Sequence, residues 1–228
     1  KINMDVLITG STGMVGKSVL NECINDNRIS KIYLINRVPV NLKSSKVYEF
    51  ILDDFLKMSE LKNKINHCDA CFHCMGITSF GQKSDYYYRV TFEMTKELTD
   101  LVYEINSNSV MTYVSGEGTS KNENSKIPWA NVKGKAENYI LNKGLKDAYM
   151  IRLGLLIPEN DVTAKTKLYN LFYTLMIPFY TLMKLIPTIT TSSKLGLAMI
   201  NCLYFPLNDK YLDNKKINKL SKMHIKNQ

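Results

Sequence analysis

Short runs of β-branched and other apolar residues alternate along the chain with longer segments whose apolar positions recur every three or four residues. This pattern predicts strands at 6–9, 32–35, 47–52, 70–74, 110–114 and 148–153. It predicts helices over about 14–25, 85–105 and 129–142. Strands that alternate with helices form parallel sheets, because parallel neighbours need a crossover connection between them. We therefore expect an α/β fold with a doubly wound parallel sheet over residues 1–160.

The pattern changes from Asp161 onward. Residues 168–183 carry no charge and are apolar on all sides of a helix. The run is shorter than the ~20 residues that span a membrane, and Pro178 interrupts it. We expect a buried helical pair that covers a cleft, with contact to a membrane surface as the alternative. With further helices predicted over about 193–204 and 215–222, residues 161–228 should form a small C-terminal helical lobe of the same domain, on the substrate side.

Three glycines, Gly10, Gly13 and Gly16, lie between the first predicted strand and the first predicted helix. The first permits a tight turn, the second lets the backbone approach a diphosphate, and the third lets helix and strand pack closely. The free N–H groups and the dipole of the helix N-terminus would then hold the diphosphate. This context predicts a dinucleotide site of the Rossmann type, with a plain strand-to-helix turn as the alternative. Other residues of the turn assigned to this site are Thr12, Met14 and Val15.

The second predicted strand ends in Asn36-Arg37, and no Asp or Glu lies between Ile32 and Ser45. A carboxylate at this place usually binds the ribose 2′-hydroxyl of NAD, whereas an arginine suits the 2′-phosphate of NADP. The sequence therefore favours NADP over NAD, unless Arg37 is an ordinary surface residue. After the third strand, Asp54 and Phe55 are assigned to the adenine end, with capping of the next helix as the alternative for the aspartate.

With the turn Thr9–Gly16, Arg37 and Asp54, the chain resembles the short-chain dehydrogenase/reductase superfamily. The resemblance is to its atypical and extended members, such as NmrA-like and Tat-interacting-protein-like oxidoreductases and NAD-dependent epimerases. It covers about residues 4–160 and continues more loosely to the C-terminus. In these relatives the end of strand four passes under the cofactor, and here it reads Cys74-Met75-Gly76.

The resemblance also implies catalytic positions. A serine ends strand five in the family, which matches Ser115, and a Tyr-x-x-x-Lys motif follows. The matching stretch is Trp129-Ala-Asn-Val-Lys133, so the lysine that holds the nicotinamide ribose is present and the tyrosine is replaced. Arg152-Leu153-Gly154 resembles the Arg-Pro-Gly that follows strand six.

Trp129 changes the expected chemistry. The family tyrosine exchanges a proton with the carbonyl group, whereas an indole N–H donates a hydrogen bond and is no acid or base near neutral pH. Another group would then have to supply the proton. The alternatives are one of the tyrosines at 86–88, or the pair Tyr139 and Lys143, which has the same spacing further along the helix.

The segment from His67 to Cys74 contains Cys68, Cys71 and Cys74 at a spacing of three, which is found in metal and iron–sulfur sites. The segment enters a predicted buried strand, where this spacing sends successive side chains to opposite faces. We therefore interpret the thiols as core residues and expect no metal site. Five cysteines without a secretory context indicate reduced thiols in a cytoplasmic protein.

Composition and charge narrow the function classes. The chain of 228 residues is 45% apolar and 22% charged, which excludes a disordered or fibrous protein. Its net charge of +9 is unevenly spread: residues 1–160 hold 20 basic and 18 acidic residues, and residues 161–228 hold 10 and 3. A local excess of positive charge argues against nucleic acid as the partner. An acidic partner or an anionic membrane surface suits this C-terminal excess better.

Together these features predict an NAD(P)(H)-binding protein of the short-chain dehydrogenase type. We expect an oxidoreductase or epimerase-like enzyme that acts on an apolar small molecule. The alternative, favoured by Trp129, is a catalytically inactive module that senses NADP(H) or binds another protein.

Overall fold

The computed structural model describes residues 3–159 and 180–224. Seven strands of the described residues form one parallel sheet in the order β3-β2-β1-β4-β5-β6-β9. Their bounds are β1 (Met4–Thr9), β2 (Ile29–Asn36), β3 (Val47–Ile51), β4 (Ala70–His73), β5 (Val110–Val114), β6 (Asp147–Ile151) and β9 (Tyr211–Leu212). The strand order reverses at β1 and β4, so the predicted doubly wound α/β fold is confirmed.

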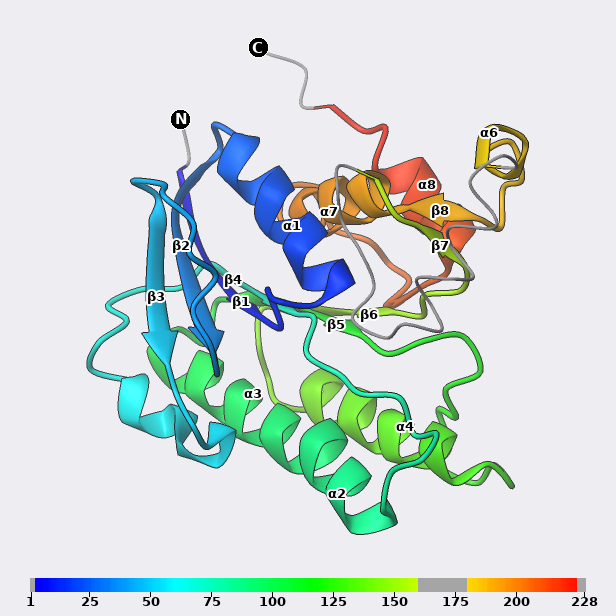
Figure 1. Ribbon diagram of the computed structural model, residues 1–228, viewed down its shortest axis with the longest axis horizontal. Coiled ribbons are helices and arrows are strands. Elements are labelled where there is room, and N and C mark those ends of the chain that lie inside the picture. The colour runs from blue at the N-terminus through cyan, green and yellow to red at the C-terminus, as the bar shows by residue number, and fades with distance from the viewer. Residues whose placement is uncertain (1–2, 160–179, 225–228) are drawn as a thin grey trace.

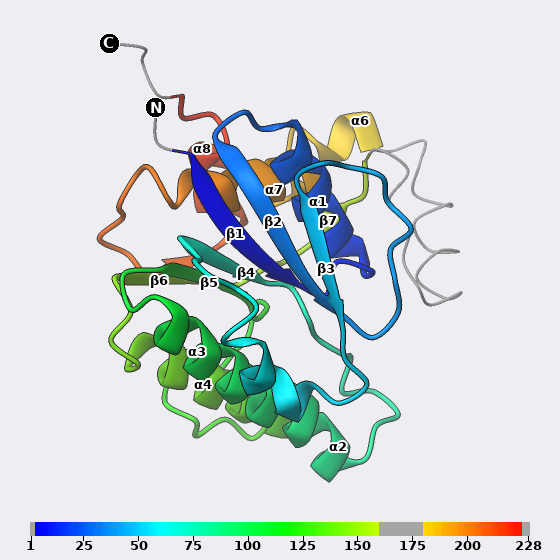
Figure 2. The same cartoon turned by 90° about the vertical axis from the view of Figure 1, so that its left-hand side faces the viewer.

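Helices cover both faces of this sheet (Figures 1 and 2). One face carries α1 (Met14–Asn25), α7 (Ser192–Asn201) and α8 (Asn214–Leu220). The other carries the 3₁₀ helix η1 (Phe55–Leu61), α2 (Ser84–Tyr88), the π-helix η2 (Arg89–Glu93), α3 (Met94–Ile105) and α4 (Pro128–Leu141). Each face has its own apolar core, one built around α1 and α7 and one around α3 and α4.

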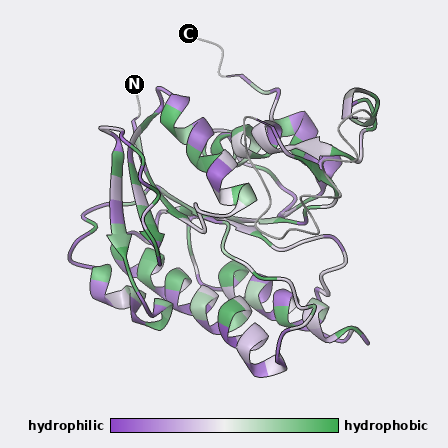
Figure 3. Ribbon diagram, viewed as in Figure 1, coloured by the Kyte–Doolittle hydropathy of each residue, from purple (hydrophilic) through white to green (hydrophobic). Residues whose placement is uncertain are grey.

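The central strands are apolar along their length because helices cover them on both sides. Val6, Leu7 and Ile8 of β1 are completely buried, as are Ile32 and Leu34 of β2. Such continuous apolar runs are typical of parallel strands. The helices instead carry hydrophobic and hydrophilic residues in alternation along their length (Figure 3), which matches one buried and one exposed side.

The predicted strands and helices of residues 1–160 are present, with some differences at their ends and in their geometry. The predicted helix over 85–105 is one continuous helix formed by α2, η2 and α3, with a π-helical segment in the middle. The strands β7 (Leu156–Ile157), β8 (Thr190–Thr191) and β9 were not predicted. Each is two residues long, which is too short for any periodic pattern.

The described part of the C-terminal segment packs against the core of the domain. α7 lies along α1, where a Cβ on Gly196 would be 2.6 Å from Cγ of Glu22. β9 joins the sheet beside β6, and α8 follows it directly. The predicted helices at 193–204 and 215–222 are therefore confirmed as α7 and α8, and the segment adds short strands to them.

Residues 168–179 of the predicted apolar pair lie outside the described residues; α6 (Tyr180–Met183) is its described end. The division at residue 160 and the position of the lobe beside the substrate stay predictions. Within the described ranges, no helix is long and apolar enough to cross a membrane. The expected cytoplasmic location also stays a prediction.

Candidate active site

The three glycines form a tight turn between β1 and α1. Gly10 has φ +74°, and its carbonyl oxygen accepts a hydrogen bond from Gly13 N–H at 2.9 Å. A Cβ on Gly10 would lie 2.6 Å from the Met75 nitrogen, and a Cβ on Gly16 would lie 2.2 Å from the Gly10 oxygen. Both positions therefore require glycine, because the backbones of β1, α1 and the chain after β4 approach too closely for a side chain.

A cleft of about 440 Å³ opens beside this turn. Nine residues predicted for the cofactor line it: Gly10, Thr12, Gly13, Asn36, Arg37, Phe55, Cys74, Met75 and Gly76. Val38 and Ile77 complete its lining. Met14, Val15 and Gly16 form the first turn of α1 instead, and Gly13 caps that helix without a side-chain hydrogen bond.

The arrangement fits a dinucleotide. A helix N-terminus without a side-chain cap can offer its first N–H groups to a diphosphate, and the glycine turn leaves room for the approach. The cleft volume is within the range of small-molecule sites. Lys133, also predicted to contact the cofactor, does not line this cleft.

Asn36 ties the glycine turn to the ends of β2 and β3. Its side chain accepts a hydrogen bond from the Ser11 hydroxyl at 2.8 Å and donates one to Glu49 Oε1 at 2.6 Å. The Glu49 carboxylate also accepts from Val40 N–H at 3.1 Å. Glu49 could not be predicted from the residues that follow β2, because it comes from the neighbouring strand β3.

Asp54 lies at the predicted adenine end and has two structural partners. Its carboxylate accepts a hydrogen bond from Leu56 N–H at 3.0 Å and so caps η1, as the alternative assignment expected. Arg89 of η2 forms an ion pair with it at 3.5 Å. Both residues, with Tyr86, line a second cleft of about 260 Å³ that shares residues with the first. Contact of Asp54 with an adenine stays a prediction.

A second cluster of polar side chains lies at the carboxyl ends of β5 and β6. The Ser115 hydroxyl donates a hydrogen bond to Glu137 Oε1 at 2.6 Å. Arg152 donates to both oxygens of the same carboxylate, at 3.2 and 2.7 Å. Glu137 is 0% exposed, so these donors balance a fully buried charge. Sequence reasoning missed Glu137, although its place four residues after Lys133 puts it on the same side of α4.

Lys133 completes this cluster. Its ammonium group donates to the carbonyl oxygen of Ser115 and lies beside Gly116, where a Cβ would be 3.6 Å from Nζ. Burial lowers the pKa of Lys133 to about 8, and the nearby charge of Glu137 opposes this shift. The structure therefore brings Ser115 and Lys133 together, as the resemblance implied.

Trp129 lies in the first turn of α4, one helical turn before Lys133. It follows Pro128, which suits the start of a helix because its missing N–H has no helical partner there. The outer edge of the indole packs beside Gly118, where a Cβ would be 3.4 Å from Cη2. The loop after β5 therefore contacts the residue at the tyrosine position through Gly118.

The sequence matches the NAD dependent epimerase/dehydratase family over residues 6–153. The chain belongs to this family. The family region covers the glycine turn, the cleft beside it and the cluster around Glu137.

Three known proteins illustrate the similarity. The mitochondrial protein FMP52 of Kluyveromyces lactis is 28% identical over 167 residues, which are 71% of this chain and 71% of that protein. The structure of the enzyme WbmF of Bordetella bronchiseptica in complex with NAD+ aligns with a TM-score of 0.68 and 12% identity, covering 95% of this chain and 77% of that one. A thiolation-reductase di-domain of an archaeal non-ribosomal peptide synthetase aligns with a TM-score of 0.67 and 17% identity, covering 89% and 68%.

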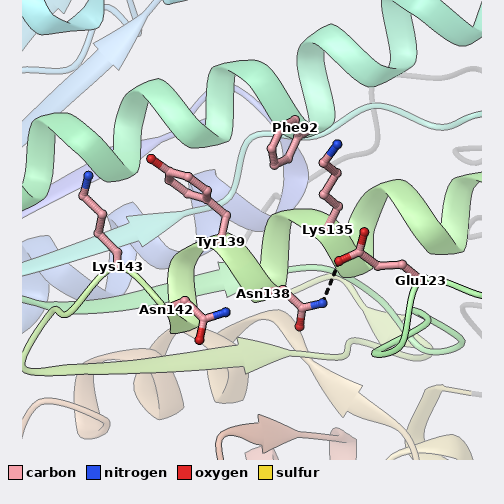
Figure 4. Close-up of a pocket in the computed structure, with 7 residues that line it drawn as sticks. All are labelled: Phe92, Glu123, Lys135, Asn138, Tyr139, Asn142 and Lys143. Atoms are coloured by element: carbon pink, nitrogen blue, oxygen red, sulfur yellow. Dashed lines mark hydrogen bonds between the residues drawn. The ribbon is translucent and has the colours of Figure 1, made fainter.

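Among the alternative tyrosines, Tyr86 is exposed and lines the second cleft, whereas the other three are engaged elsewhere. Tyr139 donates to Asp100 Oδ1 at 2.6 Å, and Lys143 pairs with the same carboxylate. Both line a surface groove of about 450 Å³ between Phe92 of η2 and the residues of α4 (Figure 4), and no residue of the glycine turn lines it. Tyr87 is buried, and the Tyr88 hydroxyl accepts a hydrogen bond from Lys135.

The cysteines of the His67–Cys74 segment are divided between the two cores. Cys68 and Cys71 pack into the core on the α3 side, and Cys74 packs against the core on the α1 side. Burial raises the pKa of the Cys68 thiol to about 12. All five cysteines are free, and the described residues contain no group of three side chains suited to a metal ion.

Proposed function

We propose that this chain is an oxidoreductase that binds NADP(H) and reduces a carbonyl group, or oxidises the corresponding alcohol, on an apolar small molecule. When bound, the nicotinamide would supply or accept the hydride. The observation that carries the proposal is the position of Lys133. The residue is half-buried, and its ammonium group is held at the end of β5, on the same edge of the sheet as the glycine turn.

NADP is proposed over NAD because of Arg37. This exposed side chain lines both clefts at the adenosine end and could pair with a 2′-phosphate. The Glu49 carboxylate beside Asn36 already accepts hydrogen bonds from Asn36 and Val40. The WbmF relative was solved with NAD+, so NAD is the competing cofactor that a test must include.

Lys133 is the group we propose for proton exchange in place of the missing tyrosine. Trp129 cannot exchange a proton, and the Ser115 hydroxyl donates its proton to Glu137. The lysine ammonium would give its proton to the carbonyl oxygen as hydride adds to the carbon, and the neutral amine would regain a proton from solvent. Glu137 and Arg152 would act as positioning residues that fix Ser115, whose carbonyl oxygen binds the lysine.

The apolar substrate class rests on the uncharged run 168–183. A small polar cleft of about 230 Å³ lies beside the cluster, and Arg152, Glu117 and Lys215 are among its lining residues. A mainly apolar molecule with one polar end would suit both features.

The second candidate is an NADP(H)-sensing module without turnover. The packing of Trp129 beside Gly118 and the buried Ser115 hydroxyl favour it, since neither side chain is poised for proton transfer.

Turnover of reduced cofactor across a panel of carbonyl compounds separates the two candidates. For the enzyme we expect reduction that slows as the pH rises through about 8, because the ammonium form of Lys133 is the acid. Lys133→Met should lower kcat by about 100-fold or more, whereas Lys133→Arg should keep cofactor binding and lose the pH dependence. An inactive parent that gains activity through Trp129→Tyr would contradict this function and favour the sensing module.

A further inference from the structure

The outer side of α8 is a row of lysines. Lys215, Lys219 and Lys222 are spaced by four and three residues, which places them on one side of the helix and its C-terminal turn, and all three are exposed. The opposite side of α8 is buried through Ile217 and Leu220. Among residues 3–159 and 180–224, no carboxylate forms an ion pair with these three lysines.

The neighbouring carboxylates of this segment are already engaged. The described residues from 180 to 224 contain two of them, Asp209 and Asp213. Asp209 pairs with Lys216 at 2.5 Å, and Asp213 caps α8 by accepting from Lys216 N–H at 2.9 Å. The three lysines are therefore exposed without an ion pair to any described carboxylate, although Lys215 shares its cleft with Glu117 and Asp213.

Three large apolar side chains are exposed on the chain that leads to this helix. Leu182 of α6 is 66% exposed, Leu185 is 76% exposed and Ile186 is 44% exposed. Three exposed apolar side chains within five residues are typical of a contact surface.

The lysine row and the apolar turn are joined by Asn218. Its side-chain amide donates to the carbonyl oxygens of Pro187, at 3.0 Å, and Ile189, at 2.8 Å. The chain directly after Ile186 is thus bound to the helix that carries the lysines. Figures 1 and 2 both draw α6 and α8 at the upper side of the molecule, above the sheet.

We propose that Leu182, Leu185, Ile186, Lys215, Lys219 and Lys222 form a docking face for an anionic lipid surface. The lysines would lie at the level of acidic headgroups while the leucines and isoleucine insert among the acyl chains. A nucleic acid would use the lysines and leave the apolar side chains without a partner, so the combination favours lipid. This inference does not depend on the proposed enzymatic function.

Vesicle co-sedimentation with the full chain tests the proposal. The protein should bind phosphatidylcholine vesicles that contain phosphatidylserine, bind pure phosphatidylcholine poorly, and dissociate as the salt concentration rises. Removing each lysine charge is expected to cost about fivefold in partitioning, and glutamate adds repulsion, so the triple change Lys215→Glu, Lys219→Glu and Lys222→Glu should weaken binding by at least about 100-fold. Leu185→Asp should weaken it while leaving the lysines in place.

A matched control variant has the same change in charge on the opposite face of the sheet. Lys57, Lys64 and Lys83 are exposed lysines on the η1 and α2 side, and changing all three to glutamate should leave vesicle binding near that of the parent. Equal loss in both triple variants would overturn the docking face, as would equal binding to pure phosphatidylcholine. Tight binding of a single-stranded RNA through the same three lysines, without vesicle binding, would also overturn it. Unfolding midpoints of each variant exclude a folding defect as the cause.

Discussion

Glu137 is the residue that most constrains the candidate active site. A completely buried carboxylate is stable only when donors surround it, and here Ser115 and Arg152 supply them. This arrangement fixes Ser115, whose carbonyl oxygen accepts a hydrogen bond from the Lys133 ammonium group. The sequence indicates Ser115 and Lys133 through a motif, but Glu137 has no motif of its own and meets Arg152 only because α4 packs against β6.

His73 is a second buried titratable residue with a fixed role. Its ring lies between the hydroxyl oxygens of Thr9, at 2.7 Å, and Thr95, at 2.8 Å, and stacks on Tyr113. Thr95 donates its own proton to the Thr91 carbonyl, so His73 Nε2 donates to Thr95 and Nδ1 accepts from Thr9. Burial lowers the pKa of His73 to about 3, which keeps the ring neutral.

This histidine should make the fold sensitive to acid. Between the model-peptide value of 6.5 and the folded value of about 3, the unfolded chain binds a proton that the folded chain does not. Stability from this group is therefore complete above pH 6.5 and is lost as the pH falls, by up to about 1.4 kcal/mol per pH unit. Urea unfolding from pH 7 to pH 4 should give a shallower pH slope for His73→Gln than for the parent. Identical slopes would contradict the buried neutral ring.

At the scale of elements, α4 is positioned by one close contact. A Cβ on Gly134 would lie 1.8 Å from the carbonyl oxygen of Ser120, which is in the loop that leads into the helix. Ser120 N–H also donates to the Ala130 carbonyl at 3.0 Å, so loop and helix are bound together. This contact sets where Trp129 and Lys133 stand relative to β5.

Gly134→Ala distinguishes the effect of this contact on the free energy of unfolding from the effect of helix propensity, because the two have opposite signs. Propensity alone predicts stabilisation by about 0.8–1 kcal/mol, because alanine is the better helix former. The contact predicts destabilisation by about 1–3 kcal/mol, because loop or helix must move. Chemical denaturation should show the loss, with Gly76→Ala as a control whose Cβ meets no atom within 4 Å. A more stable Gly134→Ala variant would show that the loop moves freely.

Elements differ in how far the sequence predicts them. α1, α3 and the long strands carry many buried residues at a regular spacing, so their period is visible. The π-helical turn η2 and the strand β9 depend on tertiary contacts instead. The hydroxyl of Thr95, which donates to the Thr91 carbonyl oxygen of η2, is also bound by His73 of β4, and β9 exists only through its pairing with β6.

For the whole molecule, the sequence predicts where ligands bind, because a doubly wound sheet has its crevice where the strand order reverses. The glycine turn and the residues Cys74–Gly76 meet at that place, as predicted. The role of Glu49 and the packing of α7 on α1 could not be predicted from the sequence. Glu49 reaches Asn36 from a neighbouring strand, and α7 is far from α1 along the chain.

The central claim is that NADP(H) binds in the cleft beside the glycine turn, and a calorimetric titration with NADPH and NADH tests it most directly. Gly76 lines this cleft and has open space around its α-carbon, so Gly76→Leu should fill the cleft and leave the fold intact. We expect the parent to bind NADPH more tightly than NADH, Arg37→Ala to reduce this preference, and Gly76→Leu to lose at least about tenfold in affinity with an unchanged unfolding midpoint. Absence of binding by the parent, or full affinity in Gly76→Leu, would contradict the assignment of this cleft.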